Sequence, residues 1–325
     1  MTAKVIVPID ITTGVGAGLQ LLANSATETA YADWVTSTAY TVGNNVKYNH
    51  RKYECLAAHT SGPTKLPGAV GGTTWLDLGP TNHWAMFDQE VSSSTSATGS
   101  LTVSVKPATA TLTSFFDTVA VLAVTGAASV RVQVFNGTGR ATGAGGVVGG
   151  DLVYTSTTNL DSTFIGDMYQ YYFAPFEVKT EVIFGNIPPY LNAEVVLTIT
   201  GTTGGITVTC GALICGLSSD LGEVQMGATA GITDYSIKQT DGFGITTLVR
   251  RNFAKRTTYS LVIANDQIRR VYSVLAELRA VPCVWIGSSN YAYSPLVVFG
   301  FYEDFDINVA YASHSTASLR IQGMI

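Results

Sequence analysis

The sequence predicts a mainly β protein, built as a small β-module, a β-sandwich or jelly-roll-like domain, and a C-terminal α+β region with one clear helix. Charged residues make up only 13% of the 325-residue chain, and glycine occurs 33 times. Short runs of β-branched residues alternate with turns rich in Gly, Pro, Ser and Thr, as is typical of β-structure. The expected domains are an N-terminal arm at 1–28, the module at 29–80, the sandwich at 81–216 and the α+β region at 217–325.

Within the expected arm, residues 5–22 superficially imitate a nucleotide-binding start, because a strand-like apolar run precedes Gly14, Gly16 and Gly18. The dinucleotide fingerprint needs a different glycine spacing and a βαβ unit, and neither occurs here. The segment is therefore predicted to be an arm that is flexible or bound to a partner. Residues 1–10 of the chain include Pro8 and no apolar run of signal-peptide length, so synthesis in the cytoplasm is expected.

Residues 29–80 combine large aromatics with turn residues, as expected for a very small β-unit with an aromatic core. Ala39–Tyr48 reads as two strands around a Gly-Asn-Asn turn, and 51–58 as the next strand after an Asn49-His50 turn. The segment 60–74 is rich in Gly and Pro. It is predicted to be a loop that returns Trp75 to the sheet.

The region 81–216 contains several short predicted strands. They are the apolar runs at 101–105, 119–124, 130–135, 194–200 and 206–213. Strands at such short intervals favour a sandwich or jelly roll over a parallel α/β sheet. The Gly-rich loop at 143–150 contains no lysine, so it is not a phosphate-binding P-loop.

The C-terminal region contains the one persuasive helix. Its apolar stripe consists of Ile268, Val271, Leu275 and Leu278. These positions recur at spacings of three and four, Pro282 ends the pattern, and Asn265 or Asp266 is the expected N-cap. Strands are predicted at 259–263, 283–287, 296–301 and 307–311.

Composition narrows the class of protein. The net charge of −5 argues against nucleic acid as a partner, and no apolar run approaches the ~20 residues of a membrane span. A weakly charged surface fits a protein packed against copies of itself or other partners.

The four cysteines are Cys55, Cys210, Cys215 and Cys283. They lack zinc-site spacing and are expected to be reduced and mostly buried. Cys210 and Cys215 are five positions apart in one strand-like run, which would place their side chains on opposite faces and makes a disulfide between them unfavourable.

No catalytic residue, metal site or cofactor is predicted. The histidines, His50, His59, His83 and His314, lie in turn-like or polar segments, and the chain contains neither HExxH nor GxSxG. Glu303, Asp304 and Asp306 are interpreted as a solvated acidic strand end, with a cation site or a hydrolase pair as the alternative. Asp234 and Asp241 form a further acid pair without a supporting motif.

Positive charge concentrates between 250 and 279. This window contains seven basic and two acidic residues, so it carries +5 while the rest of the chain carries −10. The basic residues assigned to a docking face are Arg250, Arg251, Lys255, Arg256, Arg269 and Arg270. Two interpretations stay open: a docking surface for a negatively charged neighbour, and a solvated helix with its flanks. Nucleic acid is less favoured because stacking aromatics are not interleaved with these arginines.

The aromatics of the module also have two interpretations. Sugar rings stack their C–H faces on exposed aromatic side chains, whereas a unit of about 50 residues needs large aromatics for its own core. The candidates for glycan contact are Tyr40, Tyr53 and His59. The residues assigned to the core are Trp34, Tyr48 and Trp75.

Residues 33–75 resemble the small chitin- and cellulose-binding modules of families 5 and 12. The similar positions are Trp34, Tyr40-Thr-Val-Gly43, Val46-Lys-Tyr48, Tyr53 and Trp75. The resemblance implies the same scaffold. In those modules an adjacent pair of exposed aromatics follows the second strand, where this chain reads Cys55-Leu-Ala-Ala-His59.

A wider resemblance covers most of the chain. Trp75–Asp88 followed by sandwich strands, Phe253–Arg256 and Val281–Gly287 resemble a group of phage and prophage tail or baseplate proteins. The resemblance implies a non-enzymatic structural protein of the virion tail, made in the host cytoplasm without a signal peptide, whose partners are other tail proteins and copies of itself.

Two alternative functions stay open. The first is a receptor-binding protein that recognises host surface glycans through residues 29–80. The second is a polysaccharide-trimming enzyme, for which Asp234, Asp241, Glu303 or Asp306 would be required.

Overall fold

The computed structural model describes residues 1–12, 18–28, 30–88, 90–107, 115–136, 151–160, 168, 172, 178–188, 190, 193–288, 291–309 and 311–324. Over these residues the chain is mainly β, as predicted. Gly14, Gly16 and the 143–150 loop lie outside the described residues.

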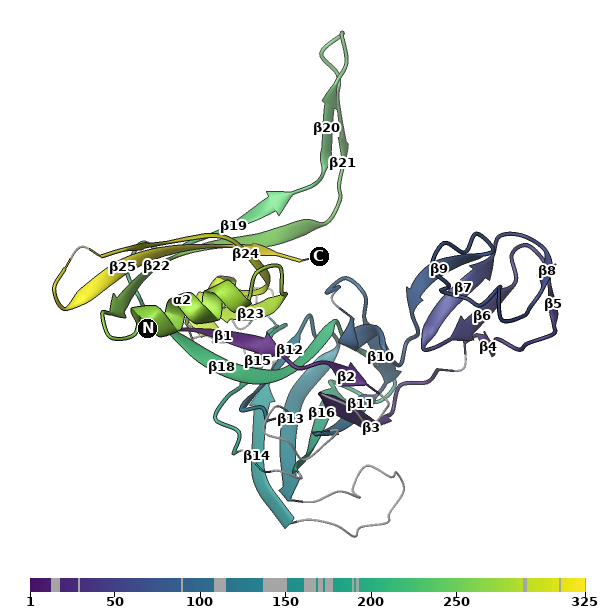
Figure 1. Ribbon diagram of the computed structural model, residues 1–325, viewed down its shortest axis with the longest axis horizontal. Helices are drawn as coiled ribbons and strands as arrows, with labels where there is room; N and C mark the ends of the chain where they lie inside the picture. Colours follow the sequence, from purple (N-terminus) through teal and green to yellow (C-terminus); the bar gives the residue numbers. More distant parts are fainter. Residues whose placement is uncertain are drawn as a thin grey trace.

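The largest sheet has nine strands, which curl strongly (Figure 1). In sheet order the strands are β15 (Val182–Phe184), β12 (Thr118–Leu122), β18 (Ala212–Val224), β1 (Thr2–Pro8), β23 (Cys283–Ile286), β24 (Val297–Asn308), β25 (His314–Gly323), β22 (Phe253–Ala264) and β19 (Thr229–Asp234). β18 also pairs with β22, with Glu223 opposite Val262. The six strands from β18 to β22 therefore close into a ring.

The helix α2 (Ile268–Glu277) packs on the core of this ring. Val271, Leu275 and Leu278 are buried together with Trp285 and Leu319, which confirms the predicted apolar stripe. The predicted N-cap is wrong, because Gln267 occupies that position. The Asn265 side chain instead donates to the carbonyl oxygens of Tyr311 and Ala312, in the loop between β24 and β25.

The prediction of an N-terminal arm that is flexible or bound to a partner is wrong. β1 lies in the middle of the nine-stranded sheet, between β18 and β23, and Ala3, Val5 and Ile6 are fully buried. The run 2–8 therefore has a structural explanation: its apolar residues reach both faces of a central strand, so they read as a continuous hydrophobic stretch.

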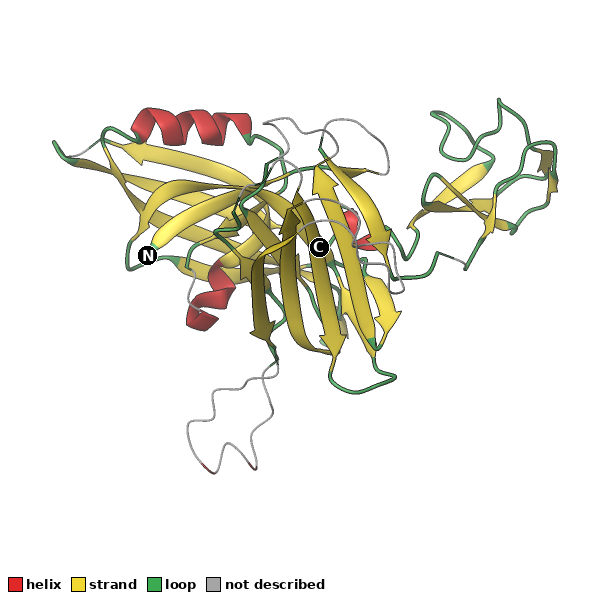
Figure 2. Cartoon of the chain, turned by 90° about the horizontal axis from the view of Figure 1, so that it is seen from below, coloured by secondary structure: helices red, strands yellow, loops and turns green. Residues whose placement is uncertain are grey.

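A second sheet packs against the β15–β12–β18 part of the first and forms a sandwich (Figure 2). Its strands, in order, are β14 (Asp151–Asn159), β13 (Ala127–Asn136), β16 (Ala193–Gly201), β11 (Ser100–Pro107), β3 (Leu19–Asn24) and β2 (Ile11–Thr12). Because β18 contributes Leu213 to the sandwich core and Leu221 to the ring core, the predicted boundary at 216/217 falls inside one continuous strand.

The predicted strand at 206–213 is divided at Gly211. β17 (Thr207–Cys210) pairs with β10 (Thr95–Thr98) in a small separate sheet, whereas β18 begins at Ala212. A Cβ on Gly211 would lie 2.7 Å from the Cβ of Ala123, so only glycine fits this corner. Cys210 and Cys215 consequently do not share a strand; both are buried in the sandwich core as free thiols.

The remaining differences from prediction concern strand length in the C-terminal region. The predicted strands at 296–301 and 307–311 belong to one strand, β24, which ends at Asn308. β25 was not predicted. Its polar residues alternate with Leu319 and Ile321, and this alternation was the available signal.

The module forms a compact unit at one end of the molecule (Figures 1 and 2). Its main sheet consists of β4 (Ala32–Asp33), β6 (Asn45–Tyr48), β7 (Arg51–Cys55) and β9 (Trp75–Pro80), and its small sheet of β5 (Ala39–Tyr40) and β8 (His59–Thr60). Asn49 and His50 both have positive φ, as a tight two-residue hairpin turn requires. Trp75 returns to the sheet as predicted, opposite Cys55.

The hairpin of β20 (Ile237–Thr240) and β21 (Thr246–Val249) projects away from the rest of the chain between β19 and β22 (Figure 1). Every residue of both strands is exposed. Two short 3-10 segments, η1 (Ala85–Phe87) and η3 (Tyr291–Leu296), complete the described elements.

Candidate functional site

The module is held together by a small, mainly aromatic core. Its buried members are Tyr40, Val46, Tyr53, Cys55 and Trp75. The ring centroids of Tyr40 and Trp75 lie 5.1 Å apart at 71°, an edge-to-face arrangement. Such pairs add to the free energy that burial alone provides, which allows a unit with few apolar residues to fold.

The polar atoms of these buried rings bond to loops. The Tyr40 hydroxyl accepts a hydrogen bond from the Val35 N–H (2.9 Å), and the Trp75 Nε1–H donates to the carbonyl oxygen of Lys65 (3.0 Å). The aromatic core thereby also fixes the course of the irregular loop at 60–74.

The three predicted glycan-contact residues are not on the surface. Tyr40, Tyr53 and His59 are only 9%, 4% and 9% exposed. His59 packs edge-to-face on Trp75, with 5.2 Å between ring centroids, and its Nδ1 donates to the carbonyl oxygen of Ala57 (2.7 Å). A sugar cannot stack on rings that the core covers, so the assignment of these residues to glycan contact is corrected.

Of the three residues assigned to the core, one lies in the core and two lie at the edge of the module. Trp75 is buried, whereas Trp34 and Tyr48 pack against the cluster and are half-buried. The rings of Trp34 and Tyr48 meet edge-to-face, with centroids 5.4 Å apart. Both rings therefore reach the surface of the module, whereas the sequence pattern predicts them in the core.

A polar contact joins the module to the sandwich. Glu28 accepts hydrogen bonds from the Thr81 hydroxyl (2.6 Å) and from His50 (3.1 Å), and His50 lies against the ring of Trp84, with 4.6 Å between centroids. Burial would raise the pKa of Glu28, but the bonds from Thr81 and His50 and the positive potential of His50 and His83 outweigh burial and lower it. The junction therefore favours an ionised Glu28.

The six basic residues assigned to one docking face do not lie together. Arg250 and Arg251 precede β22, whereas Arg269 and Arg270 follow it at the start of α2. β22 has 12 residues, and about 3.3 Å of rise per residue separates its two ends by roughly 36 Å. Arg270 binds its own fold, because its Nη2 donates to the Asp220 carbonyl oxygen (2.8 Å). The sequence window therefore contains two separate basic groups.

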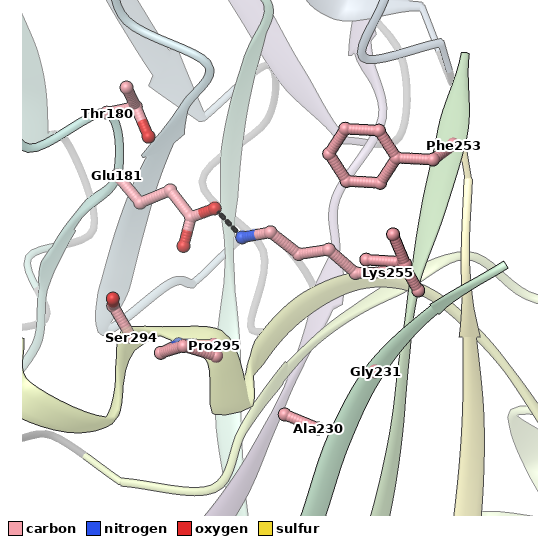
Figure 3. A pocket seen from close by; sticks show the side chains of 9 residues that line it. Thr180, Glu181, Ala230, Gly231, Phe253, Lys255, Ser294 and Pro295 are labelled. Atoms are coloured by element: carbon pink, nitrogen blue, oxygen red, sulfur yellow. Dashed lines mark hydrogen bonds and ion pairs between the residues drawn. The ribbon is translucent and has the colours of Figure 1, made fainter. Parts of the chain in front are cut away.

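Members of the first basic group line two hollows at the start of β22. Lys255 forms an ion pair with Glu181 between them, and Figure 3 shows the two side chains pointing toward one another. One pocket of about 400 Å³ lies between this ion pair and Ser294 and Pro295. The other, of about 600 Å³, extends to Arg250 and Arg251.

The acids required by an enzyme have local structural roles. Asp234 accepts a hydrogen bond from the Ser236 N–H and pairs with Lys238 (2.9 Å), contacts that lower its pKa. Asp241 accepts the N–H groups of Phe243 and Ile245 in the hairpin tip. These contacts stabilise turns. The lowered pKa of Asp234 is the opposite of the raised pKa that the acid of a glycosidase needs.

The acidic strand end at 303–306 is exposed, and the strand register places Asp304 opposite Arg320 and Asp306 opposite Ser318. Among the described residues, no three His, Cys, Asp or Glu side chains are arranged to hold a metal ion. Burial raises the pKa of the thiols of Cys210, Cys215 and Cys283 to about 12, so these side chains are protonated.

Comparison with known proteins identifies one region. Residues 33–75 match carbohydrate-binding module family 5/12. No curated protein and no solved structure matches the chain. The fold and this match together define a mainly β protein that carries a carbohydrate-binding module, and a module of this family allows polysaccharide binding. Within the described part of the chain, no helix has the length and apolarity needed to cross a bilayer.

Proposed function

We propose that this chain is a non-enzymatic structural subunit of a bacteriophage tail or baseplate, which acts by multivalent association with copies of itself and with other tail proteins. Its location would be the virion tail, after synthesis in the host cytoplasm. The small module at 29–80 would be an accessory unit attached to the rest of the chain, here called the body, and the role of the body would be assembly.

The observation that carries this proposal is the projecting hairpin β20–β21. Phe243, Ile245 and Leu248 are 93%, 66% and 70% exposed. A two-stranded hairpin is at best marginally stable without further packing, and large apolar side chains gathered on a projection are typical of an interaction site. The hairpin is explained if a neighbouring protein covers it. The low content of charged residues supports the same interpretation.

Mass spectrometry of purified phage particles, together with sedimentation of the purified chain, tests this proposal. We expect the chain in particles at a fixed multiple of other tail proteins, and an oligomer in solution. A chain that is absent from particles and stays monomeric at all concentrations would contradict the proposal.

A second candidate function is recognition of host surface glycans by residues 29–80, which the match to family 5/12 favours. The half-buried pair of Trp34 and Tyr48 is the surface we assign to it, because partly exposed rings can stack on sugars. Co-sedimentation with insoluble chitin or cellulose tests this function. We expect Tyr48→Ala to abolish binding and Leu56→Ala, an exposed change in the same module, to leave it intact. Equal binding by both variants would exclude the Trp34–Tyr48 surface.

A further inference from the structure

The 600 Å³ pocket lies at the base of the projecting hairpin and is amphipathic. Its floor is formed by Leu122, Val297 and Phe299, three members of a buried apolar cluster. Its rim carries Arg250, Arg251 and Lys255. An occupant with both an apolar side chain and negative charge would fit this combination.

The charge of the pocket is unbalanced. Glu181 is the one carboxylate among its lining residues, against three cations. Lys255 bonds Oε1 of Glu181, whereas Oε2 is buried and has no hydrogen-bond partner among the described residues. Buried acceptors are normally satisfied, so an occupant that brings an N–H group as well as an anion would complete the site.

The tip of the hairpin has the complementary chemistry. It reads Asp241-Gly242-Phe243-Gly244-Ile245. Phe243 is almost fully exposed, and Asp241 is the one acid between 235 and 249. The Gly244 N–H donates to the Asp241 carbonyl oxygen (3.1 Å), whereas the Gly242 N–H has no hydrogen-bond partner among the described residues. Asp241 uses only Oδ1 to hold the turn, so its charge is available for an incoming arginine.

The tip cannot reach the pocket of its own chain. Arg250 and Arg251 lie at the base of the hairpin and line the pocket, whereas Phe243 lies seven positions before Arg250 along a paired strand. At about 3.3 Å per residue, this places the tip roughly 23 Å from the base. Figure 1 shows the hairpin directed away from the body. The tip is therefore available only to another molecule.

We propose that the hairpin tip of one copy inserts into the pocket of the next copy, with Phe243 on the apolar floor and Asp241 against Arg250 and Arg251. This inference rests on the proposed assembly function and identifies the surfaces that join the copies. Because tip and pocket are different surfaces, the contact is head-to-tail, and its repetition builds a closed ring or an open stack.

Sedimentation velocity of the full chain provides the first test. Phe243→Ser removes the apolar anchor, and we expect the dissociation constant of self-association to rise about tenfold or more. Arg251→Glu should also weaken association, with a smaller dependence on salt than the unchanged chain shows. The matched control is Met226→Ser, an equally exposed apolar residue (94%) outside the hairpin and the pocket, which should leave the dissociation constant within about twofold.

Cysteine cross-linking provides the second test. The four native cysteines are buried, so introduced thiols react selectively. We mix the single variants Ile245→Cys and Arg251→Cys under mild oxidation and expect a disulfide-linked dimer only in the mixture. Cross-linking of Ile245→Cys with itself would indicate tip-to-tip contact and overturn the proposal.

The outcomes separate this inference from the proposed function. If the unchanged chain assembles, but Phe243→Ser assembles equally well and the mixture gives no cross-link, the tip-in-pocket contact is wrong and the assembly function stands. If the unchanged chain is monomeric and absent from phage particles, both fail. Thermal melting of each variant distinguishes lost association from lost folding.

Discussion

The small module and the large body bury their apolar side chains in different ways. The module uses a few aromatic rings, such as Tyr40 and Trp75, and ties their polar atoms to nearby loops. The body uses many β-branched and aliphatic residues on strands that pair across the whole chain, as in the pairing of Thr2 with Glu223. The module's contacts are local, whereas the body forms only when distant segments meet. We therefore expect that a substitution or deletion that unfolds one region leaves the other region folded.

The largest effect is expected from deleting residues 2–8. This change removes β1 from between β18 and β23 and uncovers both neighbouring strands. The loss should exceed the whole stability of a typical domain, about 5–15 kcal/mol. Hydrogen exchange should show an unprotected body and a protected module. If the body stays protected after this deletion, β1 is not required as a central strand of the body.

Trp75→Ala should unfold the module and leave the body folded. Truncation of a buried aromatic costs about 3–5 kcal/mol, which a unit of this size cannot tolerate. Hydrogen exchange resolved by segment measures the effect. Trp285→Ala is the reciprocal variant, because Trp285 is fully buried in the body and donates to the Gly300 carbonyl oxygen (2.8 Å). Simultaneous loss of both regions in either variant would show that they fold as one unit.

Gly68→Ala should destabilise the module more than Gly71→Ala. The two glycines have similar positive φ values, 77° and 74°, so both substitutions carry the same backbone strain of about 1–2 kcal/mol. A Cβ on Gly68 would lie 2.6 Å from the Tyr53 hydroxyl oxygen, whereas at Gly71 it meets open space among the described residues. The difference in free energy of unfolding measures the contact with Tyr53. Adding Tyr53→Phe to Gly68→Ala should relieve the steric contact with the hydroxyl oxygen. Equal losses in free energy of unfolding for Gly68→Ala and Gly71→Ala would refute the contact.

The smallest expected effect concerns the junction and its pH dependence. Because the folded pKa of Glu28 is lowered from 4.5, its contribution is fully present above that value and is lost as pH falls through the lower folded pKa. The bonds from Thr81 and His50 are worth about 1 kcal/mol. Melting curves between neutral and acid pH should show the module weakening in acid, and Glu28→Gln should flatten this dependence. An unchanged dependence in the variant would remove Glu28 as its cause.

The accuracy of sequence-based prediction follows the same division between local and distant contacts. The helix stripe at Val271, Leu275 and Leu278 was predictable because helical spacing is a local property. The turn at Asn49-His50 was predictable because few residue types adopt positive φ. The role of residues 2–8 was not, because a central strand and a partner-bound arm have the same short apolar sequence.

The functional residues show more clearly where prediction from the sequence fails. A count of charges grouped Arg250 with Arg269, but the length of β22 places them at opposite ends of a strand. Likewise, aromatic residues in a β-module are equally compatible with a core and with a binding face. Which rings became core was decided by packing: Tyr40, Tyr53 and His59 lie inside, and Trp34 and Tyr48 lie at the edge.

The sequence by itself determined the mainly β class, the helix and the identity of the small module, because propensity, periodicity and turn chemistry act over a few residues. Only the tertiary structure decided that β1 is central, that β18 links the sandwich to the ring, and that an apolar hairpin and an amphipathic pocket lie on one molecule. These features depend on pairing between residues up to 282 positions apart, as between Lys4 and Ile286. No local pattern encodes that pairing, since the same strand sequence can join many neighbours with similar energy.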